Sequence, residues 1–173
     1  MKLFLPDMYK KNILDIDYNL LKEKGIKCLI FDLDNTIALI DEGLPKKNTK
    51  DLFDNLKKDF HVIIISNNVK KRVKLYSDAL DVDYVSFAMK PLLKGMLQIK
   101  QKYHYKKKDM CMIGDQIMTD ILSGKRLGVY SILVDPMSDK DLKITKLNRF
   151  FERRVLKTLS RKYDFKKGTY YGR

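Results

Sequence analysis

Short apolar runs alternate with longer polar stretches along most of the chain. Five runs of four to six residues are apolar almost throughout, instead of alternating with polar residues, and this is typical of parallel strands that are covered on both faces. The pattern predicts strands at 28–33, 62–65, 84–87, 110–113 and 130–134.

The stretches between these runs carry apolar residues at three- and four-residue spacing, which predicts helices. We expect an N-cap at Asn48 or Thr49 for the first helix, and Pro91 suits the start of the third. The predicted helices cover 49–58, 69–80, 92–102 and 117–126. Strands that alternate with helices indicate an α/β fold, a doubly wound parallel sheet of five strands with right-handed crossovers.

The length of 173 residues suits one domain with additions at its ends. We expect a helical approach over 1–26, the α/β core over 27–140, and a basic amphipathic helix with a tail over 141–173. The apolar stripe of this last helix either packs on the domain or enters a membrane interface, and 161–173 is expected to be frayed.

Composition excludes several classes of protein. No apolar run approaches the roughly 20 residues of a membrane span, and Pro6 and Asp7 interrupt the only apolar patch near the start, so it is not a signal peptide. Cys28 and Cys111 lie in apolar runs without a second ligand at metal-binding spacing. They are interpreted as buried, reduced thiols of a cytoplasmic protein.

The net charge of +14 is unevenly distributed. Residues 143–173 hold eleven lysines and arginines and two acids, a net +9. A basic segment of this kind suits a polyanionic neighbour, either anionic phospholipid or nucleic acid, and it suits equally a solvated face that keeps the protein soluble.

The candidate chemistry lies where the predicted strands end. Asp32 and Asp34 follow the first strand, and the other candidates follow later strands: Ser66 with Asn67 and Asn68, Lys90, and Asp115 with Asp120. In doubly wound sheets ligands bind at this edge. Several carboxylates in one crevice repel each other unless a cation lies among them, and oxygen ligands without His or Cys point to Mg²⁺. One carboxylate is then available as a nucleophile for phosphoryl transfer.

These residues resemble the four ordered motifs of haloacid dehalogenase (HAD) superfamily phosphatases across roughly 27–135. The segments IFDLDNT, ISNN, KP and IGDQIMTDI, and the NRFFER stretch at 148–153, look like the narrower YqeG family of subfamily III-A. That family is related to mitochondrial phosphatidylglycerophosphate phosphatases. The resemblance implies a Rossmann-like HAD fold and a phosphoric monoester hydrolase that requires Mg²⁺.

The resemblance also implies roles for individual residues. Asp32 would be the nucleophile that forms an aspartyl-phosphate, and Asp34 the general acid and base. Ser66 and Lys90 would bind the transferring phosphoryl group, with Asn67 as a further substrate contact. The metal set would be Asp32, the main-chain carbonyl of Asp34, Asp115 and Asp120, the last more as a second-sphere support.

Plainer roles exist for the same residues. Asp32 and Asp34 could cap a helix, Ser66 could cap the helix after it, and Lys90 could be an ordinary surface lysine. Thr36 is expected to stabilise the turn by bonding near Asp34. His61 and the segment 103–105 are expected to have no chemical role.

The motif intervals leave no room for a cap domain, because Asp34 and Ser66 are 32 residues apart and Ser66 and Lys90 only 24. The expected site is therefore open and suits a phosphate displayed on something large. The leading substrate is a phosphatidylglycerophosphate-like lipid, which places the protein at the inner face of a membrane. The alternatives are a nucleotide, a sugar phosphate or a phosphoprotein, or a basic module that binds nucleic acid or the ribosome.

Overall fold

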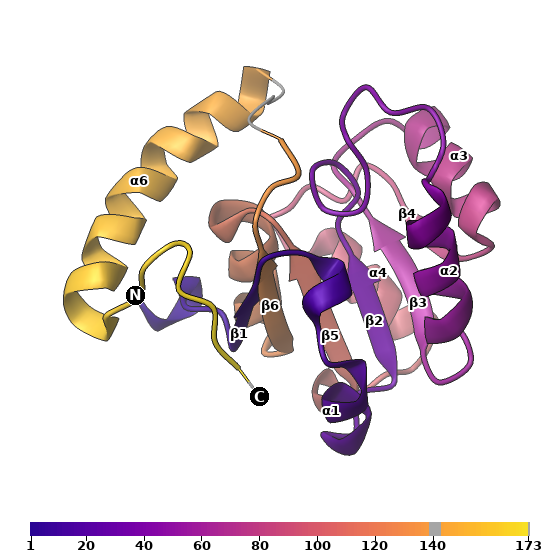
Figure 1. Cartoon of the computed structure of the whole chain (residues 1–173), viewed down its shortest axis with the longest axis horizontal. Helices are drawn as coiled ribbons and strands as arrows, with labels where there is room; N and C mark the ends of the chain where they lie inside the picture. Colours follow the sequence, from indigo (N-terminus) through magenta and orange to yellow (C-terminus); the bar gives the residue numbers. More distant parts are fainter. Residues whose placement is uncertain (139–142, 173) are drawn as a thin grey trace.

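A six-stranded parallel sheet forms the centre of the molecule (Figure 1). The computed structural model describes residues 1–138 and 143–172, and of residues 143–150 it describes the backbone alone. The strand order is β1-β6-β5-β2-β3-β4, and every neighbouring pair is parallel. The strands are β1 (Met8–Lys10), β2 (Cys28–Phe31), β3 (His61–Ile65), β4 (Asp83–Val85), β5 (Met110–Gly114) and β6 (Tyr130–Val134).

The predicted doubly wound α/β sheet is confirmed, but it has six strands where five were expected. The additional strand, β1, lies in the segment predicted to be a helical approach. Its residue Met8 is in register with Ile132 of β6. Only one short helix, α1 (Tyr18–Glu23), forms in this segment, beside two turns of 3₁₀ helix at Lys2–Phe4 and Ile13–Asp15. A three-residue strand gives no apolar run, and its pairing is long-range.

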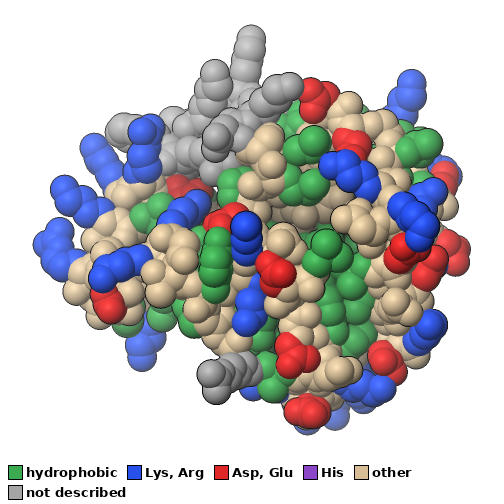
Figure 2. All heavy atoms as spheres, viewed as in Figure 1, with side chains coloured by type: hydrophobic (Ala, Val, Ile, Leu, Met, Phe, Trp, Pro, Cys, Tyr) green, Lys and Arg blue, Asp and Glu red, His purple; other side chains and the backbone are tan. Residues whose placement is uncertain are grey.

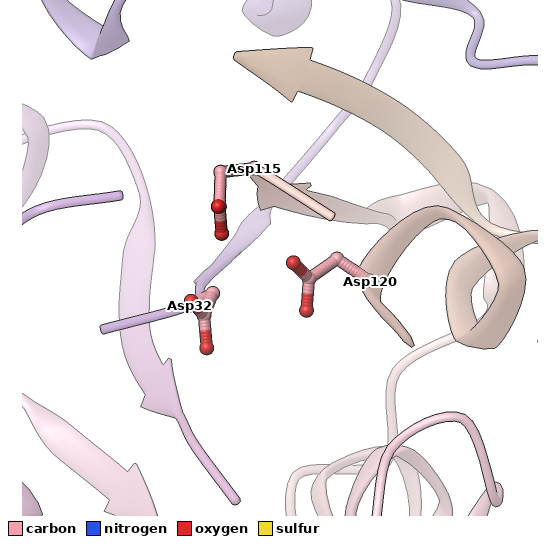
Figure 3. Close-up of side chains that lie close together, drawn as sticks. All are labelled: Asp32, Asp115 and Asp120. Atoms are coloured by element: carbon pink, nitrogen blue, oxygen red, sulfur yellow. The ribbon is translucent and has the colours of Figure 1, made fainter. Parts of the chain in front are cut away.

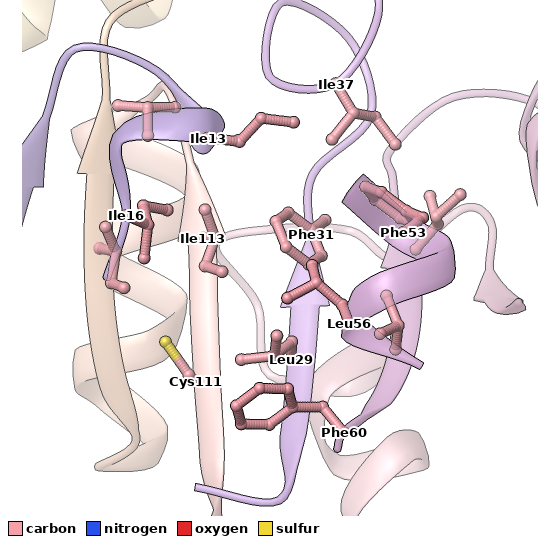
Figure 4. Close-up of a cluster of buried hydrophobic side chains, with 14 of the residues drawn as sticks. Ile13, Ile16, Leu29, Phe31, Ile37, Phe53, Leu56, Phe60, Cys111 and Ile113 are labelled. Carbon is pink, nitrogen blue, oxygen red and sulfur yellow. The ribbon is translucent and has the colours of Figure 1, made fainter. Parts of the chain in front are cut away.

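Helices cover both faces of the sheet. Apolar side chains of α1, α2 (Lys47–Leu56) and α3 (Lys70–Leu80) pack on one face. Those of α4 (Lys94–Lys102) and α5 (Leu122–Leu127) pack on the other. Figure 4 shows the first of these two cores, where Phe31 of β2 meets Phe53 of α2 with ring centroids 5.0 Å apart.

The two cysteines lie in different cores, because Cys111 is in register with Leu29 and not with Cys28. Side chains alternate between the faces of a strand. Cys28 therefore points toward α4 and Cys111 toward the face that α1 and α2 cover. Both are buried and unpaired, so the adjacent strands do not bring the thiols together.

The helix boundaries differ from the predictions at the N-terminal ends. Helix α2 begins at Lys47, before the expected caps, and its N-cap residue Lys46 forms no side-chain cap. Helix α4 begins at Lys94, three residues beyond Pro91. The segment predicted as one helix over 117–126 is a π-helical turn, η4 (Ile117–Ile121), that continues into α5.

The C-terminal segment is ordered where fraying was expected. Helix α6 (Lys143–Tyr163) continues past 160, and residues 164–172 fold back onto β1 (Figure 1). Tyr171 forms an antiparallel bridge with Tyr9, and Phe165 is buried. These contacts join residues about 160 positions apart, so no local pattern predicts them.

Helix α6 packs through one side and presents the other to solvent. Leu159 is buried in a cluster with Tyr9, Ile117 and Leu133, and Val155 packs against this cluster, so the C-terminal part of the apolar stripe packs on the domain, whereas Phe151 is 45% exposed. Figure 2 shows lysine and arginine side chains over α6, and the exposed ones include Arg153, Arg154, Lys157, Arg161 and Lys162. The side chains of 143–150, part of the predicted stripe, and the expected domain boundary at 140–141 lie outside the described residues.

Candidate active site

Three aspartates meet at the carboxyl edge of the sheet (Figure 3). Asp32 follows β2, Asp115 follows β5, and Asp120 lies in η4. One carboxylate oxygen from each lies within 4.8 Å of the other two, and all three side chains are buried. The pairing of β2 with β5 places Asp32 beside Asp115.

Lys90 joins two of these carboxylates. Its Nζ lies 2.5 Å from Asp32 Oδ1 and 2.7 Å from Asp120 Oδ1, and it also donates to the carbonyl oxygen of Ile65 at 3.2 Å. The side chain is 3% exposed. A lysine buried to this degree has a structural or chemical task, which sets Lys90 apart from an ordinary surface lysine.

The surroundings shift the proton affinity of both groups. Burial raises the pKa of Asp32 from 3.8 to about 7, against the lowering effect of Lys90. Burial would also lower the pKa of Lys90, but Asp120 and Asp32 outweigh it and hold that pKa above its usual range. Lys90 is therefore the charged partner, and burial favours the protonated form of Asp32.

Asp120 approaches the end of β5 so closely that only glycine fits at position 114. A Cβ on Gly114 would lie within 2.6 Å of three side-chain atoms of Asp120. The other oxygen of Asp120 accepts from the backbone N–H of Gln116 at 3.1 Å. The Gly-Asp pair of the fourth motif thus has a steric basis: Gly114 makes room for Asp120 beside Lys90.

Asp34 is not a member of the acidic cluster and has partners of its own. Asn68 Nδ2 donates to Asp34 Oδ2 at 2.9 Å, and Arg72 Nη2 donates to Asp34 Oδ1 at 3.2 Å. Arg72 also donates to the carbonyl oxygens of Leu39 and Glu42, which ties the loop after β2 to α3. The side chain of Asp34 therefore has a defined orientation, and its carboxylate is not a member of the metal-sized cluster.

Thr36 contacts two members of the cluster, where a bond near Asp34 was expected. Its Oγ1 lies 3.4 Å from Asp32 Oδ2 and 3.4 Å from Asp115 Oδ1. The intervening residue Asn35 adopts a left-handed conformation, with φ of 64°. The turn at Asn35 directs Thr36 back toward the strand ends.

Ser66 and Asn67 follow β3 and have different partners. The Ser66 hydroxyl accepts from the backbone N–H of Asn68 at 3.0 Å, as in a turn before a helix, and Ser66 is buried. Asn67 accepts from the backbone N–H of Lys90 at 2.7 Å and donates to its carbonyl oxygen at 2.9 Å. Asn67 thus fixes the backbone of Lys90, a task that the predicted role as a substrate contact did not include.

The sequence did not single out Arg72 and gave Asn68 no partner. Arg72 follows two lysines at the start of α3 and looks like a solvated residue. Only the packing of the loop 39–44 against α3 shows that the Arg72 side chain is 14% exposed and lies against Asp34. No chemical role was expected for His61 and residues 103–105. The rings of His61, Tyr103 and Tyr105 pack together at the amino edge of the sheet, with His61 Nε2 2.8 Å from Asp83 Oδ2.

The donor set suits a hard divalent cation. Three carboxylates and one ammonium leave a formal charge of −2 in a buried volume when all are ionised, and every available donor of the cluster is oxygen. Asp32, Asp115 and Asp120 are the side chains that could hold such an ion.

The segments between the motifs contain no inserted domain. Residues 33–65 form a loop, α2 and β3, and residues 67–89 form a turn, α3, β4 and a second loop. All of these residues lie within the described part of the chain. The chain between the motifs therefore supplies no lid domain over the carboxyl edge.

Comparison with known sequences shows the protein family to which the chain is related. The chain matches the family described as mitochondrial PGP phosphatase over residues 1–137. It is 41% identical over 162 residues to the protein named Probable phosphatase YqeG of Bacillus subtilis (strain 168), which covers 93% of this chain and 94% of that protein. It is 24% identical over 144 residues to phosphatidylglycerophosphate phosphatase 1, chloroplastic/mitochondrial, of Arabidopsis thaliana, which covers 78% of this chain and 41% of that protein.

Solved structures agree on the fold. An uncharacterized protein from Listeria monocytogenes serotype 4b superposes with a TM-score of 0.55 at 16% identity, over 68% of this chain and 85% of that one. A HAD family enzyme from Bacteroides thetaiotaomicron, in complex with magnesium and inorganic phosphate, superposes with a TM-score of 0.51 at 14% identity, over 70% of this chain and 99% of that one. The expected Rossmann-like HAD fold is confirmed, and by its sequence the chain belongs to the mitochondrial PGP phosphatase family together with YqeG.

Proposed function

We propose that this HAD-superfamily phosphatase is Mg²⁺-dependent and hydrolyses a phosphomonoester through an aspartyl-phosphate at Asp32, with a phosphatidylglycerophosphate-like lipid as its substrate. The observation that carries the proposal is the contact of Lys90 Nζ with both Asp32 and Asp120, within a buried cluster of three carboxylates. A nucleophilic carboxylate held by an ammonium and flanked by metal ligands is equipment for attack on phosphorus.

In the first step, a carboxylate oxygen of Asp32 attacks phosphorus and the bond to the alcohol oxygen breaks. Asp34 supplies a proton to the departing oxygen. In the second step it takes a proton from a water that attacks the phosphorus, and the bond from phosphorus to Asp32 breaks to release inorganic phosphate. The proximity of Asp34 to the nucleophile supports this role, since its charge contributes to the raised pKa of Asp32. Arg72 and Asn68 fix its direction.

Lys90 and Ser66 bind the transferring group. Lys90 is fixed at its side chain by two carboxylates and at its backbone by Asn67, so its charge needs no reorganisation when phosphate enters. Ser66 lies at the end of β3, next to the strand that carries Asp32. We assign Asn67 to positioning Lys90.

Asp32, Asp115 and Asp120 would hold Mg²⁺, with the main-chain carbonyl of Asp34 as a further ligand. Bound there, the ion would neutralise the excess negative charge of the site and of the phosphate. Thr36 orients the first two carboxylates through its hydroxyl.

Two features support a lipid substrate over a small free metabolite. The name of the related Arabidopsis thaliana protein specifies phosphatidylglycerophosphate. The site also lacks an inserted cap, so it can accept a phosphate that remains attached to a surface. No helix in the described part of the chain is long and apolar enough to cross a bilayer.

A phosphate-release screen with Mg²⁺ tests the substrate. Phosphatidylglycerophosphate in mixed micelles, nucleotides, sugar phosphates and a phosphopeptide are compared at equal concentration. We expect the lipid to give a kcat/KM at least about tenfold above the others, a difference of about 1.4 kcal/mol. A nucleotide or sugar phosphate that surpasses the lipid contradicts the substrate, and no release from any of them contradicts the enzyme.

A further inference from the structure

Four large apolar side chains are exposed on the two loops beside Lys90. The exposed fractions are 51% for Val69, 58% for Phe87, 50% for Met89 and 50% for Leu92. We call these four residues the apolar rim. Single exposed apolar residues are ordinary, but a group of them at one place marks an interaction surface.

The rim is one surface because its two loops are hydrogen-bonded to each other. The backbone N–H of Phe87 donates to the carbonyl oxygen of Asn68 at 3.2 Å, and that of Ala88 to the carbonyl oxygen of Ser66 at 3.0 Å. Leu92 joins through its N–H, which donates to the carbonyl oxygen of Met89 at 2.7 Å. Val69 therefore lies beside Phe87 at the mouth of the site.

The backbone directs these side chains outward at a conformational cost. Phe87 and Met89 adopt left-handed conformations, with φ of 48° and 57°, which bulky residues rarely do. Their neighbours Ala88 and Lys90 are 1% and 6% exposed. The segment thus buries every second residue and projects Phe87 and Met89 into solvent, and strain of this kind collects at functional sites.

Exposed lysines lie next to the rim. Lys70 and Lys71 follow Val69 at the start of α3, and Lys94 follows Leu92 and Leu93 at the start of α4. All three lysines thus lie at the N-terminal end of a helix, where the helix dipole disfavours cations. No residue in the described ranges forms an ion pair with these three lysines, so their charges are available to anions outside the molecule.

We propose that the apolar rim and these three lysines dock the mouth of the site onto an anionic lipid bilayer. Apolar side chains that enter the headgroup boundary, with lysines that attract anionic lipid around them, are the combination that holds proteins at a membrane surface. This inference rests on the proposed function and adds the orientation of the site at the membrane. The catalytic edge faces the bilayer, and a lipid phosphate reaches Asp32 without the lipid leaving the membrane.

Vesicle flotation with the full chain tests the docking surface. The double variant Phe87→Asn/Met89→Asn removes both apolar side chains and keeps the left-handed backbone, which asparagine adopts readily. Its matched control is Leu75→Gln/Leu97→Gln, two exposed leucines on the flanks of α3 and α4. A third variant, Arg153→Glu/Lys157→Glu/Arg161→Glu, reverses one exposed stripe of α6.

We expect the wild-type chain to float with vesicles of phosphatidylglycerol and phosphatidylcholine, and not with phosphatidylcholine alone. The rim variant should lose about tenfold or more of this binding, while the leucine control and the α6 variant keep most of it. The ratio of turnover on vesicle lipid to turnover on a soluble aryl phosphate should fall in parallel in the rim variant.

Two results would overturn the docking surface. One is loss of binding in the α6 variant with full binding in the rim variant, which would assign docking to the basic helix. The other is no binding of the wild-type chain at physiological salt, which would leave the rim for a protein partner. Vesicle binding needs no turnover, so a chain that binds vesicles through the rim but hydrolyses no lipid supports the surface and contradicts the proposed substrate.

Discussion

The guanidinium of Arg72 lies against the carboxylate of Asp34, with Nη2 and Nε at 3.2 and 3.4 Å from Oδ1. The same side chain donates to two carbonyl oxygens of the loop 39–44. One residue of α3 thus fixes both the proposed general acid and the loop that follows it.

The Arg72→Met variant tests this link. We expect kcat on an aryl phosphate to fall by about 10- to 100-fold with little change in KM, because Asp34 loses its orientation while phosphate binding remains. Lys71→Met, the exposed neighbour, is the control and should be near wild type. Equal losses in kcat for both variants would show that α3, and not the contact with Asp34, is responsible.

The Asp32→Asn variant tests the nucleophile. An amide cannot form the acyl-phosphate, so turnover should fall by about 1,000-fold or more. The chain should stay folded by circular dichroism, since Lys90 keeps Asp120 as a partner. The control for loss of a carboxylate is Asp83→Asn, which changes an acid at the amino ends of the strands, away from the site. Retained activity in Asp32→Asn would exclude covalent catalysis at this position.

Magnesium should stabilise the folded chain through the acidic cluster. At about 100 times Kd, binding contributes about 2.7 kcal/mol, which corresponds to an increase in Tm of about 5–10 °C for a chain of this size. Asp115→Asn should abolish most of the increase. Sodium chloride at matched ionic strength is the control, and an equal shift with sodium would contradict a specific site.

The same measurement should depend on pH. Because the folded state raises the pKa of Asp32 from 3.8 to about 7, the cation-free fold binds a proton that the unfolded chain releases. This group therefore makes the cation-free fold less stable as pH rises from about 4 to 7. Protons compete with the ion below pH 7, so we expect a larger Mg²⁺-induced shift at pH 8 than at pH 6. A shift independent of pH would contradict the coupling.

The two thiols should be unreactive in the folded state. Burial raises the pKa of Cys28 to about 12 and the pKa of Cys111 well above its usual value. At pH 8 the thiolate of Cys28 is then about 1 part in 10,000. Ellman's reagent should modify neither cysteine until guanidinium unfolds the chain, when both react. Rapid reaction of the native protein would contradict their burial.

Tyr9→Phe tests the contact between β1 and the C-terminal segment. The Tyr9 hydroxyl donates to Asp135 and accepts from the backbone N–H of Gly168 at 3.0 Å. Its loss leaves both without this partner and should cost about 1–2 kcal/mol in the free energy of unfolding. The control is Tyr84→Phe on the other edge strand, whose hydroxyl makes no hydrogen bond with the described residues. Equal stability of the two variants would show that the bonds contribute nothing.

Much of the sheet was predictable because a buried parallel strand has a continuous run of apolar residues in the local sequence. All five predicted strands exist, and their polar ends converge, so the grouping of Asp32, Asp115 and Lys90 could be expected from sequence. The roles of these residues stay predictions. The contacts of Thr36, Asn67 and Arg72 could not be expected, because they depend on how loops far apart in the chain pack.

The ends of the chain were predicted poorly for a related reason. The β1 strand and the segment after α6 stabilise each other: Tyr9 contacts Tyr170, and the Tyr171 hydroxyl donates to the carbonyl oxygen of Pro6 at 2.9 Å. Each of the two segments is short and rich in aromatic or basic residues, and neither has the apolar periodicity that indicates a helix or a strand. The local sequence therefore predicted a helix for one and fraying for the other.

The bridge from Tyr171 to Tyr9 has a consequence for synthesis on the ribosome. Strand β1 is translated first, but its neighbour β6 and its cover at 165–171 emerge more than 120 residues later. The central strands can pair while the chain is still being synthesised, whereas β1 stays unpaired until β6 and residues 165–171 have been synthesised. A chaperone that holds this early segment would find Met8 and Tyr9 exposed for most of translation.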